Sequence, residues 1–105
     1  MCDSADNLRA SLAALRDVQP VQEGTDAVRE AFASVQTDFA QLRADASAEY
    51  AAEFDHVQAD ADGVRTAVET AQDSPSAQTL GAVASAIGVL VSDGDALVDK
   101  VESTC

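Results

Sequence analysis

The chain has 105 residues, of which 19 are acidic and six are basic, so its formal net charge is -13 at pH 7, and 47% of its residues are hydrophobic. This length allows one domain with one core. So acidic a surface excludes binding to nucleic acid phosphates, and the hydrophobic fraction excludes a disordered acidic tail. Much of the apolar content is alanine, the best helix former, and apolar residues recur at spacings of three and four. The composition therefore predicts a single all-α domain.

The first predicted helix covers residues 3–18. Asp3 or Ser4 is placed to cap its N-terminus. Pro20 and Gly24 follow it and predict a connection, because both residue types interrupt helices. The apolar residues of this segment recur at helical spacing: Ala5, Leu8, Leu12 and Leu15.

The second predicted helix covers residues 25–46, with Thr25 or Asp26 as its cap. Its apolar residues follow one another in steps of four and three, which is typical of a helix that packs on other helices. These residues are Val28, Phe32, Val35, Phe39, Leu42 and Ala46.

After Ala46 the apolar pattern shifts by one residue. It continues at Tyr50, Phe54, Val57, Ala61, Val64, Val68 and Ala71. A stutter in one long helix would explain the shift, and so would a corner near residues 45–48, with Asp45 or Ser47 as cap. One helix over 25–72 would be ~70 Å long, which is unusual for a chain of this size. We therefore predict a third helix over 48–72.

The fourth predicted helix covers residues 75–102, with Ser74 as cap and Pro75 at its first position. Its apolar stripe consists of Leu80, Val83, Ile87, Leu90, Gly94, Leu97 and Val101. Residues 81–91 are apolar on nearly all sides, which predicts the most buried helix of the protein. The small residues Gly81, Ala84 and Gly88 would let a neighbouring helix approach closely. This stretch is too short for a membrane span of ~18 apolar residues, and acidic residues follow it directly.

Four such segments predict an antiparallel four-helix up-down bundle, and the alternative is three helices with one long central helix. In either arrangement the two ends of the chain meet, which predicts a disulfide between Cys2 and Cys105. A lipid anchor at Cys2, as in a bacterial lipoprotein, and two free thiols are the alternatives. The disulfide or the anchor implies an exported protein.

Several short runs resemble the small exported or lipid-anchored α-helical proteins of actinobacteria. These runs are DNL at 6–8, LRDV at 15–18 and VQEGTDAV at 21–28, together with Leu12 and the cysteine near the terminus. The resemblance spans most of the chain. It implies export and a helical fold, and it carries no catalytic residue.

One stretch is similar to a calcium-binding EF-hand loop, QADADG at 58–63 followed by Glu69. Asp60, Asp62 and Glu69 stand at loop positions three, five and twelve. Gln58 replaces the usual aspartate at position one, and Arg65 adds a repelling charge. The apolar helical pattern also runs through this stretch, and the same residues cannot form both a helix and a loop.

Glu53 and His56 form a second candidate metal site, because their Glu-x-x-His spacing places both side chains on one helix face. A dimer would supply a second copy of the pair, with Glu49 or Asp60 adding oxygen ligands. The alternative is a solvated polar face. The metal sites proposed from the sequence thus use Glu53, His56, Asp60, Asp62 and Glu69, with calcium or another divalent metal as cofactor.

No nucleophile motif or phosphate loop is present, so the sequence predicts a protein that is not an enzyme. We expect an exported, extracellular or envelope-associated protein, monomeric or dimeric, that acts through an unknown protein partner or as a structural element. A metal- or small-ligand-binding bundle that uses the acidic region 53–69 is the alternative function. A cytoplasmic protein of a salt-adapted organism is the alternative localisation.

Overall fold

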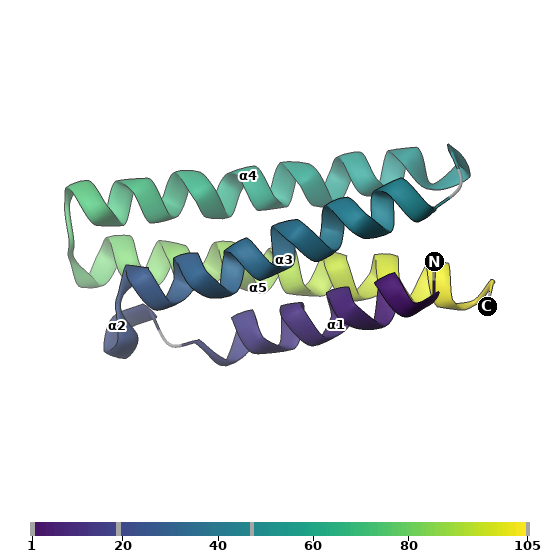
Figure 1. Cartoon of the computed structure of the whole chain (residues 1–105). Helices are drawn as coiled ribbons and strands as arrows, with labels where there is room; N and C mark the ends of the chain where they lie inside the picture. The colour runs from purple at the N-terminus through teal and green to yellow at the C-terminus, as the bar shows by residue number, and fades with distance from the viewer. Residues whose placement is uncertain (1, 19, 47, 105) are drawn as a thin grey trace.

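The computed structural model describes residues 2–18, 20–46 and 48–104, which form an up-and-down bundle of four long helices (Figure 1). The bundle measures 43 × 21 × 17 Å. A four-residue helix, α2, lies between the first two long helices, and a short 3-10 turn, Ala48–Tyr50, precedes the third. The helices are α1 (Cys2–Asp17), α2 (Pro20–Glu23), α3 (Thr25–Asp45), α4 (Ala51–Asp73) and α5 (Ala77–Glu102). The fold is therefore the all-α bundle that the helical spacing predicts.

The long helices are not packed equally closely. α1 packs along both α3 and α5, and α4 packs along α5. α3 and α4 touch much less, and Figure 1 shows α3 running obliquely to α4. The interior of the bundle is consequently less well covered between α3 and α4 than on its other sides.

The shift in the apolar pattern marks a corner of the chain. α3 ends at Asp45, and the chain then turns through the 3-10 segment into α4. The single long central helix considered from the sequence is therefore not formed. Ser47, one of the two predicted caps at this corner, lies outside the described residues, and the N-cap residue of α4 is Tyr50, without a side-chain cap.

The predicted start of the last helix was wrong by two residues. Ser76, and not Ser74, is the N-cap of α5: its hydroxyl accepts from the Thr79 backbone N–H, while Thr79 Oγ1 accepts from the Ser76 backbone N–H. This reciprocal pair satisfies two N–H groups at the helix start. Pro75 therefore precedes the helix and does not occupy its first turn.

The other predicted N-terminal caps were also wrong. α1 already begins at Cys2, so Asp3 and Ser4 lie inside its first turn. The N-cap residue of α3 is Gly24, which has a φ of 84° and provides no side-chain cap for the helix. A positive φ is accessible to glycine without the steric cost that other residues meet, so Gly24 sets the direction in which the chain enters α3.

The predicted apolar stripes form the core. Every residue of these stripes is buried except Ala46 and Leu80, which are partly buried against the same cluster. Phe39 and Phe54 pack with ring centroids 5.5 Å apart and tie α3 to α4 near the corner. The sequence pattern thus identified the inward face of each long helix.

α5 is not buried on all sides, contrary to the sequence prediction. Gly81, Ala84 and Gly88 face outward, and Val89 is 52% exposed. No atom lies within 4 Å of a Cβ built on Gly81 or Gly88. The close approach occurs instead at Gly94, whose hydrogen faces the Leu12 side chain.

One helix of the described chain, α5, is long and apolar enough to cross a membrane by length and composition, so the prediction that this stretch is too short for a span was wrong. The mean hydropathy of its most apolar window is 1.5, and 39% of that window is buried inside the bundle. Core helices of soluble proteins have the same length and composition, so this feature alone assigns no membrane location.

Candidate functional site

Three side chains that can bind a metal ion meet between α4 and α5. His56 and Asp60 lie one turn apart on α4, and Asp93 faces them from α5. One ligand atom from each residue lies within 4.8 Å of those of the other two. His56 Nε2 is 3.0 Å from Asp93 Oδ2. The sequence prediction named His56 and Asp60, and the fold adds Asp93.

The carboxyl group of Asp60 is in an unfavourable position for a charge. Its Oδ2 atom is buried and finds no hydrogen-bond donor among the described residues. Burial raises the pKa of Asp60 to about 6, and the neighbouring Asp93 adds to this rise. A buried, unpaired carboxylate oxygen destabilises a protein unless a proton or a cation neutralises it.

Asp93 carries the opposite shift. The hydrogen bond with Asp60 lowers the pKa of Asp93, and the charge of His56 acts in the same direction. Below about pH 6, Asp60 therefore holds a proton and Asp93 is ionised, whereas above that pH both carboxyl groups are ionised and repel each other. A cation at the same place would replace that proton and interact with both carboxylates.

The remaining residues of the predicted metal sites lie elsewhere. Glu53 pairs with Lys100, and this ion pair lowers the pKa of the Glu53 carboxyl. Asp62 lies 3.4 Å from Arg65 on the outer side of α4. Glu69 borders the groove between α3 and α4, two turns beyond Asp62. Glu53 and His56 therefore do not form the predicted pair of metal ligands, because the Glu53 carboxylate is paired with Lys100 of α5.

The EF-hand-like loop is not formed. Residues 58–69 lie entirely within α4, and its apolar face, which includes Ala61 and Val64, is buried in the core. In a helix Asp60 and Asp62 point to different sides, so they cannot enclose one calcium ion as loop positions three and five do.

The donor set at the α4–α5 site favours a metal of the zinc class over calcium. Imidazole nitrogen suits zinc, copper and nickel, whereas calcium takes oxygen ligands only. Ligand atoms around a tetrahedral zinc ion lie about 3.4 Å apart. The three side chains would therefore move slightly closer together around the ion. The His56 ring has room for this movement, because 68% of the His56 side chain is accessible to solvent.

The α4–α5 site opens onto a surface groove of about 360 Å3 that Glu53, His56, Asp93 and Lys100 border. Solvent therefore reaches the His56 ring directly. The three side chains leave further coordination positions for water, as sites with three protein ligands do.

The predicted disulfide involves a residue that the structure does not describe. α1 begins and α5 ends at the same end of the bundle (Figure 1), as expected for four antiparallel helices. The thiol of Cys2 is not free. Cys105 lies outside the described residues, so its pairing with Cys2 stays a prediction.

Comparisons with known proteins add nothing to this description. The sequence matches no protein-family model, and neither the curated proteins nor the solved structures give a significant match.

Proposed function

We propose that this protein is a helical bundle, without enzymatic activity, that binds a divalent metal ion of the zinc class at His56, Asp60 and Asp93. One observation carries the proposal: within the described part of the chain, the buried Asp60 Oδ2 has no hydrogen-bond donor, and it belongs to a group of three metal-ligating side chains. A cation would satisfy this oxygen and remove the repulsion between the two carboxylates.

The rest of the chain supplies no competing imidazole. His56 is the single histidine of the sequence, and Glu53 and Asp62 are held in ion pairs with Lys100 and Arg65. The net charge of -13 also attracts cations of every kind to the surface. A test must therefore distinguish specific binding from this general attraction.

The experiment is a titration of the protein, prepared without a histidine tag, with zinc chloride, followed by calorimetry and by NMR of the His56 ring nitrogens. We expect one binding event per chain and a large shift of the Nε2 signal. His56→Gln and Asp93→Asn should each weaken zinc binding at least tenfold, because each removes one of three ligands.

Glu69→Gln provides the matched control, since it removes the same charge from α4 at a distance from the site. It should leave zinc affinity within twofold of the original protein. Equal losses in Glu69→Gln and Asp93→Asn, or zinc binding without a change at His56, would disprove the site. Calcium should bind no more tightly than magnesium, because neither takes the imidazole nitrogen.

We further propose that the protein is exported and that Cys2 and Cys105 form a disulfide. The position of the start of α1 beside the end of α5 supports the pairing (Figure 1). Intact mass spectrometry of the purified protein before and after reduction tests it. A gain of two hydrogens on reduction supports the disulfide; thiols that react fully before reduction, or a lipid mass on Cys2, contradict it.

A further inference from the structure

The loosely packed side of the bundle contains a pocket that the metal proposal does not use. It has a volume of about 220 Å3 and reaches from the surface between α3 and α4 into the centre of the bundle. Its walls are apolar and come from all four long helices. The buried part of the lining consists of Leu8, Leu12, Val35, Phe39, Val57, Ala61, Leu90 and Gly94.

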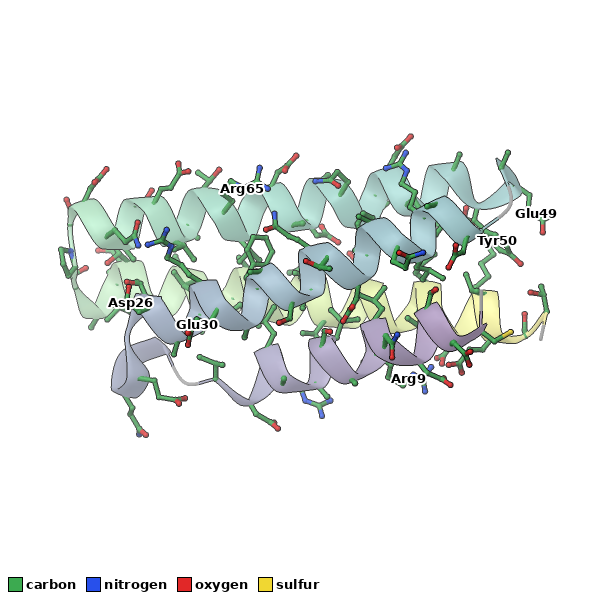
Figure 2. The ribbon with its side chains drawn as sticks, in the orientation of Figure 1. Arg9, Asp26, Glu30, Glu49, Tyr50 and Arg65 are labelled. Carbon is green, nitrogen blue, oxygen red and sulfur yellow. The ribbon has the colours of Figure 1, made fainter. Side chains whose placement is uncertain are left out.

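The rim of the pocket is polar and carries two arginines, each of which is paired with an aspartate of α4. Arg43 from α3 and Arg65 from α4 line it, together with Gln36 and Gln58. Figure 2 labels Arg65, which lies near the middle of α4. Arg29 borders the adjoining groove. Three of the six basic residues of the chain thus lie along the space between α3 and α4, although the whole protein is strongly acidic.

Both arginines of the rim keep hydrogen-bonding capacity for a ligand. Arg43 Nη2 contacts Asp55 at 2.7 Å, and Arg65 Nη1 lies 3.4 Å from Asp62. A guanidinium group has five N–H donors, so one contact leaves most of them available. Arg43 is also held over the Phe54 ring, 5.9 Å from its centroid, which fixes its charge near the pocket.

We propose that this pocket binds an unbranched aliphatic carboxylate, with the alkyl chain in the bundle and the carboxylate at the rim, where Arg43 and Arg65 supply the cationic groups. An apolar pocket with a few polar groups at one end is the usual form of a small-ligand site. Apolar cavities of ~150 Å3 bind benzene, so this pocket is large enough for a hydrocarbon. The arginine pair sets the charge of the head group, because a guanidinium matches a carboxylate in charge and shape.

The pocket volume sets an approximate upper limit on the length of the alkyl chain. A methylene group occupies about 30 Å3, similar to the share of one water molecule in the liquid. The pocket of about 220 Å3 therefore holds roughly seven carbons beyond the carboxylate. Octanoate fits this length. Each buried methylene increases affinity about fourfold, so hexanoate, which has two methylenes fewer, should bind roughly fifteenfold more weakly than octanoate.

The experiment follows binding of octanoate to the full chain by NMR, with hexanoate, decanoate, 1-octanol and octylammonium as comparisons. We expect chemical-shift changes at Val35, Phe39 and Leu90, tighter binding of octanoate than of 1-octanol, and the weakest binding for octylammonium. Decanoate should gain little over octanoate, because the pocket is full. Affinity that keeps rising with chain length would indicate attachment to the surface and would overturn the proposal.

Variants separate the pocket from its rim. Ala61→Leu places three more carbons in the pocket and should reduce octanoate affinity at least tenfold. Arg43→Gln and Arg65→Gln should weaken octanoate binding and leave 1-octanol binding unchanged. Arg16→Gln is the control, since it removes the same charge from α1, away from the pocket.

The arginine variants decide the test if Ala61→Leu does not fold. Equal loss of octanoate binding in Arg16→Gln and Arg65→Gln would show a general charge effect and refute the assigned head-group site. Absence of any octanoate binding by the original protein would refute the pocket altogether. The result does not depend on the metal site, because none of the pocket residues contributes to it.

Discussion

Replacement of Asp60 by asparagine tests the electrostatics of the α4–α5 site in the absence of metal. Asparagine has the shape of a protonated aspartate, but it cannot ionise. Its amide can still donate a hydrogen bond to Asp93, as the protonated Asp60 carboxyl does. We therefore expect Asp60→Asn to stabilise the metal-free protein near neutral pH.

The magnitude follows from the pKa of Asp60, which rises from 3.8 to about 6 on folding. A raised carboxyl pKa means that the folded state binds the proton more tightly than the unfolded state, so this group lowers stability as pH rises from about 4 to about 6. The full shift corresponds to about 3 kcal/mol. The opposite shift of Asp93 and partial exposure to solvent reduce this amount, and we expect about 1 kcal/mol.

The assay is urea unfolding in the presence of EDTA at two pH values. At about pH 7.5, Asp60 of the folded protein is ionised, and at about pH 4 it is largely protonated. At the higher pH, the free energy of unfolding of Asp60→Asn should be about 1 kcal/mol greater than that of the original protein. At the lower pH, the two free energies should be equal. Asp62→Asn, the exposed control, should change stability by less than about 0.5 kcal/mol at both. Destabilisation by Asp60→Asn at the higher pH, or an equal effect at both, would refute the reasoning.

Four further substitutions test the packing and the caps by measured free energies of unfolding. Leu90→Ala should cost about 2–5 kcal/mol, because Leu90 is fully buried; a loss below about 1 kcal/mol would contradict its place in the core. Gly88→Ala should stabilise by about 0.5–1 kcal/mol, because nothing lies near its added methyl group; destabilisation would mean that another molecule covers this face. Ser76→Ala should cost about 1 kcal/mol, and Ser74→Ala less, whereas equal losses would contradict the observed cap.

The spacing of apolar residues was sufficient to predict the helices and their inward faces. Helical geometry places residues three and four apart on the same side, so each stripe identifies the buried face before the helices are assembled. The one-residue shift after Ala46 located the corner for the same reason. Cap positions were predicted poorly, because Ser74 and Ser76 both suit a helix start and only the path of the chain selects one of them.

The metal site was partly predictable. The i, i+4 spacing of His56 and Asp60 shows in the sequence that they share a helix face. Asp93 is 33 residues further along the chain, and no local pattern links it to them. Only the antiparallel packing of α4 on α5 brings Asp93 to His56, and the same packing removes Glu53 from the site by supplying Lys100 as its partner.

The sequence by itself determined that this is an acidic helical bundle with a core of known residues, because periodicity is a property of the single helix. The tertiary structure decided where the helices separate. The oblique course of α3 opens an apolar pocket towards Arg43 and Arg65, although every one of its buried residues was already predicted as core. The same stripe residues fit a closed or an open bundle, because helical spacing fixes which face turns inward and not the angle at which two helices cross.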